Sequence, residues 1–293
     1  MNIDLALRQT RARIAAVTGD PREADAMARL IFHALKGWSS TDLVIHSADE
    51  ASPFILGRID EILERLAKSE PLQYILGATR FYGMDLDVDR HTLIPRPETE
   101  ELVELMVGEY RDCPDLRVLD IGTGSGAIAL ALSRNLPFSR VTALDVSEGA
   151  LAVARRNAAR LHARIDFLCE DVFAYTPAPG SFDLIVSNPP YIALSESSSM
   201  DSRVLDYEPH GALFVPDSDP LLFYRRIAAI ALRAFSSAGS GHSSLPALWL
   251  EINPIFAEPL KEMLIGEGFE NVSLINDMTR RPRFAYAQAP CIR

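Results

Sequence analysis

After Asp115 the sequence alternates between strand-like and helix-like segments, and this alternation is the feature that most constrains the fold. Strand-like segments are expected at residues 117–121, 141–145, 165–168, 182–187 and 247–252. Helix-like segments are expected at residues 125–135, 147–161, 220–236 and 254–266. Such alternation predicts an α/β fold with a parallel sheet and right-handed crossover connections. Two last strands, 272–276 and 283–287, are separated too briefly for a crossover, which predicts an antiparallel hairpin.

The N-terminal part of the chain is of a different kind. Its apolar residues recur at helical spacing, with charged residues between them. Asp20-Pro21 and Ser52-Pro53 are typical of helix caps that are followed by proline in the first turn. We therefore predict a small helical domain at residues 1–70.

The character of the sequence changes near Glu70. Residues 73–77 and 81–88 gather β-forming residues around glycines, which predicts a β-hairpin. We assign this hairpin to a linker at residues 71–92, and the remainder of the chain to a second domain at residues 93–293.

A further helix is predicted at about residues 97–110. Pro97 suits its first turn, and the acidic residues that follow suit the positive end of its dipole. Arg96 lies between two prolines and is therefore rigidly displayed, although an ordinary surface ion pair is also compatible with its position. Serine- and glycine-rich runs at residues 195–202 and 236–244 predict loops.

Charge and cysteine content restrict the class of protein. The net charge of −11 over 293 residues argues against bulk nucleic acid as the main partner, because neutralising phosphates requires a basic surface. Cys113, Cys169 and Cys291 share no metal-ligand or redox spacing, so we expect reduced thiols and no metal site. The N-terminus has no export signal, and no apolar stretch is long enough to cross a bilayer. A cytoplasmic protein without a membrane partner is predicted.

A polar amide and two prolines directly follow the apolar run of residues 182–186. Pro189 and Pro190 lack backbone N–H groups, so the strand must end and the chain must stiffen there. Asn188 is thereby presented at the carboxyl end of a buried strand, which is where ligands bind in open α/β sheets. An ordinary strand-to-loop exit is the alternative, because Asn-Pro is a common turn signal.

The chemistry that suits this corner is the binding of an –NH2 group. The side-chain oxygen of Asn188 and the carbonyl of Pro189 are two acceptors for the two N–H bonds, and Tyr191 adds an aromatic wall. The lone pair of an amide nitrogen is a poor nucleophile because it is delocalised into the carbonyl. Two fixed acceptors would aim that lone pair at an electrophile, which is catalysis by positioning.

A second constellation lies where the helix predicted at residues 125–135 begins. The order Gly-x-Gly-x-Gly, from Gly122 to Gly126, allows a ligand to approach the backbone closely and presents free N–H groups to it. It is neither the dinucleotide fingerprint nor a phosphate-binding loop, since no lysine follows. Asp145 closes the next strand, where two ribose hydroxyls would be held. With Asn188, these features form a specific combination.

This combination resembles a class I S-adenosylmethionine-dependent methyltransferase that acts on amino groups. The resemblance to the HemK/PrmC family is closer still and covers almost the whole chain. It rests on the motifs Pro71-x-Gln73-Tyr74-Ile75-x-Gly77, Leu93-Ile94-Pro95-Arg96-Pro97-Glu98-Thr99-Glu100, Asp120-Ile121-Gly122-Thr123-Gly124-Ser125-Gly126, Ser187-Asn188-Pro189-Pro190-Tyr191-Ile192 and Tyr207-Glu208-Pro209. Members methylate the glutamine amide in the Gly-Gly-Gln loop of peptide-chain release factors. The implied fold is a seven-stranded Rossmann-like sheet with an antiparallel last hairpin, preceded by a small helical domain.

The resemblance also implies roles for individual residues. The methionine part of S-adenosylmethionine would contact Gly122, Thr123, Gly124, Ser125 and Gly126. Its ribose would bind Asp145, its adenine would border Asp171 and Val172, and Asn188 would also lie against the cofactor. The glutamine amide of the substrate would be held by Asn188, Pro189, Pro190 and Tyr191, of which Asn188, Pro189 and Tyr191 are the expected catalytic residues. The pocket would be shaped, or its loops held, by Arg96, Pro97, Glu98 and Glu208.

Two positions depart from the family pattern. Members often carry an aromatic residue where this chain has Val172, and Pro254 lies near a position that is usually glutamine. We interpret the nearby Glu251 as structural.

The implied reaction is in-line methyl transfer from S-adenosylmethionine to the glutamine nitrogen, with S-adenosylhomocysteine as the product. No metal is expected, because the leaving thioether is neutral. The expected partner is a release factor, and nucleic acid is not expected as a substrate. Two alternatives stay open: an amino-methyltransferase for adenine or cytosine in nucleic acid, which would need a flipped base, and an inactive cofactor-binding protein of the translation machinery.

Overall fold

The computed structural model describes residues 1–235 and 246–290. The chain forms two compact units. One consists of Met1–Ala78 together with Asp201–Tyr207, and we call it the helical unit. The other consists of Thr79–Met200 and Glu208–Arg293, and we call it the sheet unit. The loop predicted at residues 236–244 and Cys291 lie outside the described residues.

The helical unit is built from amphipathic helices around an apolar core. Its N-terminal helices are α1 (Ile3–Thr18), α2 (Pro21–Lys36), α3 (Ser40–Ile45), α4 (Pro53–Leu66) and α5 (Leu72–Leu76). As the sequence predicts, the side chain of Asp20 caps α2 and that of Ser52 caps α4, each accepting from a backbone N–H of the first turn. Ile14, Ile31 and Phe32 are at most 1% exposed and lie in the core of this unit.

The hairpin prediction is wrong for residues 73–77, which are helical or cap a helix. Gly77 ends α5 in the left-handed conformation, and its N–H donates to the carbonyl of Gln73. Leu72, Tyr74 and Ile75 are buried by this single turn, a pattern too short to show helical periodicity. The hairpin itself consists of β1 (Ala78–Phe81) and β2 (Met84–Asp87), joined by a two-residue turn.

The segment Asp201–Tyr207 contains α9 (Ser202–Tyr207) and belongs to the helical unit. Arg203 forms an ion pair of 2.6 Å with Glu23 of α2, and it also pairs with Asp201. The hydroxyl of Tyr207 donates to the carbonyl of Lys68 at 2.7 Å. Residues far from the N-terminus in sequence therefore complete this unit.

The serine-rich run before α9 is also more regular than predicted. Leu194–Ser199 form the 3-10 helix η1 instead of a loop. The carboxylate of Glu196 accepts from the N–H of Ala193, and Asp217 accepts from both the N–H and the hydroxyl of Ser195. These side-chain acceptors satisfy the start of η1, and sequence spacing alone does not indicate them.

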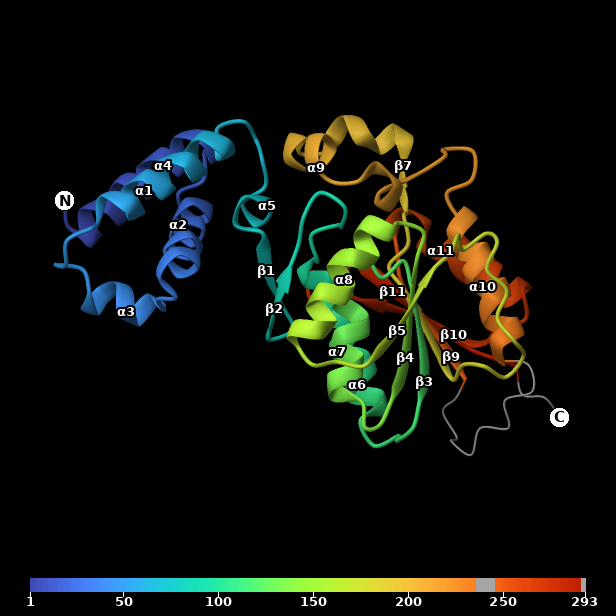
Figure 1. Ribbon diagram of the computed structural model, residues 1–293. Helices are drawn as coiled ribbons and strands as arrows, with labels where there is room; N and C mark the ends of the chain where they lie inside the picture. The colour runs from blue at the N-terminus through green and yellow to red at the C-terminus, as the bar shows by residue number, and fades with distance from the viewer. Residues whose placement is uncertain (236–245, 291–293) are drawn as a thin grey trace. The chain divides into compact units, whose positions relative to one another are not determined.

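The sheet unit contains the predicted seven-stranded sheet, in the order β10-β11-β9-β6-β3-β4-β5 (Figure 1). Five strands are parallel: β3 (Arg117–Ile121), β4 (Arg140–Asp145), β5 (Ile165–Cys169), β6 (Leu184–Ser187) and β9 (Ala247–Glu251). The last two, β10 (Glu270–Asn276) and β11 (Pro282–Gln288), form the predicted antiparallel hairpin. The α/β fold class and this topology are confirmed.

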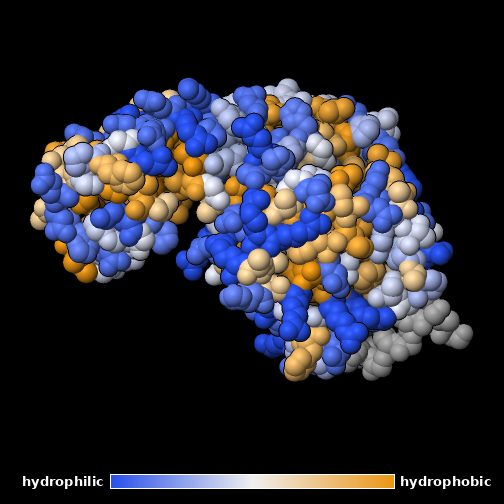
Figure 2. All heavy atoms as spheres, in the orientation of Figure 1, coloured by the Kyte–Doolittle hydropathy of each residue, from blue (hydrophilic) through white to orange (hydrophobic). Residues whose placement is uncertain are grey.

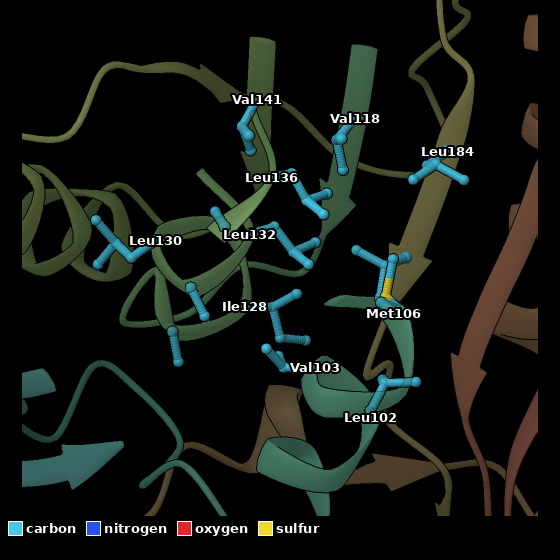
Figure 3. Close-up of a cluster of buried hydrophobic side chains, with 14 of the residues drawn as sticks. Leu102, Val103, Met106, Val118, Ile128, Leu130, Leu132, Leu136, Val141 and Leu184 are labelled. Carbon is cyan, nitrogen blue, oxygen red and sulfur yellow. The ribbon is translucent and has the colours of Figure 1, made fainter. Parts of the chain in front are cut away.

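Helices cover both faces of this sheet, which explains why most residues of its central strands are apolar. They are α6 (Pro97–Tyr110), α7 (Ala127–Asn135), α8 (Glu148–Arg160), α10 (Leu222–Phe235) and α11 (Ala257–Gly266). Figure 3 shows one of the two cores, in which α6 and α7 face the sheet through Leu102, Val103, Met106, Ile128 and Leu132, opposite Val118, Val141 and Leu184. The next residue of β3, Leu119, lies in the core of the opposite face.

Short elements complete the unit beyond the carboxyl end of β6. They are β7 (Ile192–Ala193), η2 (His210–Ala212), β8 (Phe214–Val215) and η3 (Pro254–Phe256). The strand β3 has β4 on one side and β6 on the other, so the order of the strands reverses there. Such a switch point is where ligands bind in open α/β sheets.

Candidate active site

A cavity of about 410 Å³ lies at the carboxyl ends of β3, β4 and β6. Ten of the residues predicted to bind cofactor or substrate line it: Gly122, Thr123, Gly124, Ser125, Asp145, Asp171, Val172, Asn188, Pro189 and Pro190. The structure therefore brings together the glycine turn, the acidic strand end and the Asn-Pro-Pro corner. Gly126 and Tyr191, also predicted, do not line this cavity.

The glycine turn is held against Asp145. Gly124 has a left-handed φ of 55°, and its N–H donates to Asp145 Oδ2 at 2.9 Å. Asp145 Oδ1 accepts from the N–H of Ser147 at 2.9 Å. Burial raises the pKa of Asp145, and these N–H bonds act in the opposite direction. Gly126 has a packing role, since a Cβ there would lie 3.2 Å from the Cβ of Ala154.

Asp120, in β3, supports the same turn through its side chain. In the sequence it is part of a motif, but no role is predicted for it. Asp120 is fully buried; its Oδ2 accepts from the hydroxyl of Thr123 at 2.7 Å and from the N–H of Ala129 at 3.2 Å. Oδ1 is buried without a hydrogen bond in the described part of the chain. Burial raises the pKa of Asp120 to about 7. The available sequence signal was an acidic residue inside an otherwise apolar strand.

The raised pKa of Asp120 predicts a pH-dependent stability. The folded protein holds this proton more tightly than the unfolded chain does, so the contribution of Asp120 is fully present below its ordinary pKa of 3.8 and is lost as pH rises through about 7. Between these two pH values, the unfolding free energy of the wild type should therefore fall by at most about 1.4 kcal/mol per pH unit because of Asp120. The variant Asp120→Asn should lack this fall. Urea unfolding at several pH values measures this slope. Asp166→Asn, at an exposed position of β5, is the control and should keep the wild-type slope, whereas identical slopes for Asp120→Asn and wild type would contradict the prediction.

Asn188 is oriented by a chain of hydrogen bonds. Its Nδ2 donates to Thr99 Oγ1 at 3.2 Å, and Thr99 in turn donates to Glu251 Oε2 at 2.7 Å. Because the hydroxyl proton of Thr99 goes to Glu251, its oxygen accepts from an N–H, and this fixes which way the Asn188 amide is turned. The Oδ1 atom of Asn188 makes no hydrogen bond within the described residues. It is left as an acceptor for another molecule.

Tyr191 joins the same network from the other side. Its hydroxyl donates to Glu251 Oε1 at 3.1 Å, and its ring packs against the apolar core between the sheet and α10 and α11. Its predicted role as a wall for the substrate stays a prediction. Burial raises the pKa of Glu251, and the hydrogen bonds from Thr99 and Tyr191 act in the opposite direction. Glu251 thus links two motifs far apart in sequence, and Thr99 is a site residue that the sequence analysis missed.

The other predicted pocket residues lie in or bind the segment that leads into α6. They are Arg96, Pro97, Glu98 and Glu208. The buried carboxylate of Glu208 accepts from Arg96 at 2.6 Å and from the N–H of Ile94 at 3.2 Å. Pro97 is the first residue of α6 and Glu98 lies in its first turn. None of these four predicted residues lines the cavity, although their neighbours Pro95, Thr99 and Pro209 do.

Asn253 immediately precedes Pro254, one of the two positions that depart from the family pattern, and it connects three segments by hydrogen bonds. Its Nδ2 donates to the carbonyl of Tyr191 at 3.1 Å and to Glu196 at 3.0 Å, while its Oδ1 accepts from the N–H of Ile255. It therefore ties η1 to the chain that follows the Asn-Pro-Pro corner, and Pro254 lies at the start of η3.

The described residues contain no group of three or more His, Cys, Asp and Glu side chains arranged to hold a metal ion. Over residues 1–235 and 246–290, no helix has the length and apolar character needed to span a membrane.

Comparisons with known families match both units. Residues 6–77 match the PrmC N-terminal domain, and residues 118–201 match a methyltransferase domain. Among solved structures, the hMettl16 catalytic domain in complex with MAT2A 3'UTR hairpin 6 has a TM-score of 0.52 at 17% identity, covering 81% of this chain and 82% of that chain. At that identity the likeness concerns the fold alone.

Relatives of known name are much closer in sequence. The release factor glutamine methyltransferase of Bacteroides thetaiotaomicron is 41% identical over 91% of this chain and 93% of its own length. That of Flavobacterium psychrophilum is 40% identical over 88% and 90%, and that of Deinococcus radiodurans is 35% identical over 96% of both. Agreement over nearly the full length, together with the assembled cavity, shows that the chain belongs to the release factor glutamine methyltransferase family.

Proposed function

We propose that this protein methylates the side-chain amide nitrogen of the glutamine in the Gly-Gly-Gln motif of peptide-chain release factors, using S-adenosylmethionine. The observation that carries the proposal is the hydrogen-bonded orientation of Asn188 at the edge of the cavity. Its Nδ2 is committed to Thr99, which leaves Oδ1 to accept from a substrate –NH2 group. Family membership supports the same substrate.

The residues of the glycine turn fit the cofactor. The left-handed turn at Gly122 and Gly124 lets a ligand lie against the backbone, and the carboxylate of Asp145 retains lone pairs for ribose hydroxyls. Val172 and Asp171 border the cavity, where they would flank the adenine. When bound, S-adenosylmethionine supplies an electrophilic methyl group on a sulfonium.

The Asn-Pro-Pro corner would hold the other reactant. Asn188 Oδ1 and the carbonyl of Pro189 would accept the two amide N–H bonds, and this turns the nitrogen lone pair toward the methyl. Pro190 and Phe223 line the cavity, and their apolar side chains would keep water away from the bound amide. The amide nitrogen becomes acidic as it is methylated, so its proton leaves late, and no strong base is required. Tyr191 would support this corner through Glu251.

We propose that the helical unit recognises the release factor. It carries exposed apolar side chains on several helices, namely Leu5, Val17, Leu30, Val44, Ile45 and Phe54, which are 42–72% exposed. Figure 2 shows hydrophobic surface between hydrophilic residues on one face of this unit. Such surface is suited to contact with a protein more than with a nucleic acid backbone.

Mass spectrometry of the Gly-Gly-Gln peptide tests the proposal. After incubation of purified release factor with enzyme and S-adenosylmethionine, we expect the addition of one methyl group on the glutamine. A release factor in which that glutamine is replaced by asparagine should stay unmodified. Methylation of DNA or RNA, with none on the release factor, would instead support the amino-methyltransferase alternative, which the named relatives do not support.

A further inference from the structure

His91 lies at the rim of the cavity and has no place in the proposed chemistry so far. Its side chain is 55% exposed, and it lines the same cavity as Asp145, Ser147 and Ala150. It precedes the buried Thr92 in the segment that leads to α6. The histidine therefore faces the part of the cavity on the α8 side of the glycine turn.

A glycine in α8 makes room for this imidazole. A Cβ built on Gly149 would lie 2.6 Å from His91 Cδ2 and 2.9 Å from Cγ, distances that real Cβ atoms do not show. The backbone of Gly149 does not have a left-handed φ, so conformation does not explain the glycine. Glycine is also a poorer helix former than alanine in the first turn of a helix. A side chain at position 149 would therefore displace the ring of His91 from the place it occupies.

The imidazole ring of His91 is oriented by a hydrogen bond to Asp89. His91 Nδ1 lies 2.8 Å from Asp89 Oδ1, and the N–H of His91 donates to the same oxygen at 2.9 Å. Arg156 of α8 donates to Asp89 Oδ2 at 3.2 Å. Because a carboxylate only accepts, Nδ1 carries the proton, which leaves Nε2 of the neutral ring as an acceptor. Nε2 makes no hydrogen bond within residues 1–235 and 246–290.

We propose that His91 is a cofactor-binding residue and that its Nε2 accepts a hydrogen bond from a ribose hydroxyl. This inference rests on the proposed use of S-adenosylmethionine. His91 and Asp145 line the same cavity, so Nε2 and the carboxylate would together offer two acceptors, which suits a diol with two hydroxyl donors. The same pair would repel the carboxylate of the methionine part, so the ribose is the group that fits.

A double-mutant cycle tests the pair His91 and Gly149. Calorimetry with S-adenosylhomocysteine should show about tenfold weaker binding for His91→Ala, which is the loss of one hydrogen bond. Gly149→Ala should weaken binding to a similar extent by displacing the ring, while its thermal unfolding shows that it folds. The double variant should bind as His91→Ala does, because Gly149 acts only through His91. His91→Gln, which keeps an acceptor near the Nε2 position, should bind more tightly than His91→Ala.

The same measurements separate this inference from the proposed function. If wild type does not bind S-adenosylhomocysteine, the proposed cofactor is wrong. If wild type binds but His91→Ala binds equally well, only the role of His91 is overturned. An analogue that lacks both ribose hydroxyls should bind wild type and His91→Ala with the same affinity. A His91→Ala penalty that persists with this analogue would rule out the ribose as its partner.

Discussion

Asn188→Ala should lower kcat for methylation of the release factor on the order of a hundred- to a thousand-fold, the range found when one positioned group of an active site is removed. The side-chain oxygen of Asn188 is the acceptor that the network through Thr99 leaves for the substrate. Binding of S-adenosylhomocysteine should stay nearly unchanged, because the glycine turn and Asp145 would carry most of the cofactor contacts. Single-turnover methyl transfer and calorimetry measure the two effects separately.

Asn135→Ala is a matched control for this experiment. Asn135 is an exposed asparagine whose Nδ2 also donates to a single acceptor, the carbonyl of Ala131 at the end of α7, and it does not line the cavity. Its replacement should leave kcat at the wild-type value. If Asn188→Ala lost cofactor binding and turnover in equal measure, Asn188 would be a cofactor ligand and the proposed grip on the substrate amide would be wrong.

Thr99→Val should lower kcat by roughly ten- to a hundred-fold, with little change in KM, although Thr99 transfers no atom in the reaction. The substitution keeps the shape of the side chain but leaves Asn188 Nδ2 and Glu251 Oε2 without their shared partner. An unpaired buried polar group costs about 1–3 kcal/mol, so the free energy of unfolding should fall as well. Most of the loss in kcat would come from the side-chain amide of Asn188, which would be free to rotate and exchange the positions of its oxygen and nitrogen.

Two further variants separate positioning from a general structural defect. Thr99→Ser keeps the hydroxyl and should recover most of kcat, even if the lost methyl group lowers stability. The double variant of Thr99→Val and Asn188→Ala should be no slower than Asn188→Ala alone, since Thr99 acts on catalysis through Asn188. Additive losses in the double variant would show that Thr99 affects the reaction by another route.

The strands and the ligand-binding edge could be predicted because their signals are local. An apolar run ended by two prolines specifies both where β6 ends and that Asn188 lies at its carboxyl end. The glycine turn and Asp145 follow neighbouring strands, so a parallel topology is enough to bring them to one cavity. The antiparallel last hairpin follows from the short connection between its strands.

Long-range hydrogen bonds explain what the sequence did not reveal. In the sequence, nothing distinguishes Thr99 from its neighbours in the first turn of α6. Its position between Asn188 and Glu251 depends on the fold. The short helix α5 resembles a strand in sequence, because a single buried turn is too short to show a helical period. The membership of residues 201–207 in the helical unit depends on Arg203 and Tyr207 finding partners more than a hundred positions away.

That membership has a consequence for anyone who wishes to build chimaeras of this enzyme. The chain passes from one unit to the other after Ala78, again after Met200 and a third time after Tyr207. A truncation that begins at Thr79 would therefore strip α9 of Glu23 and Lys68, its anchors, only one residue before the buried Glu208. Grafting a foreign recognition module requires exchanging two stretches of sequence together, and a simple fusion at the N-terminus would leave residues 201–207 without the unit to which they belong.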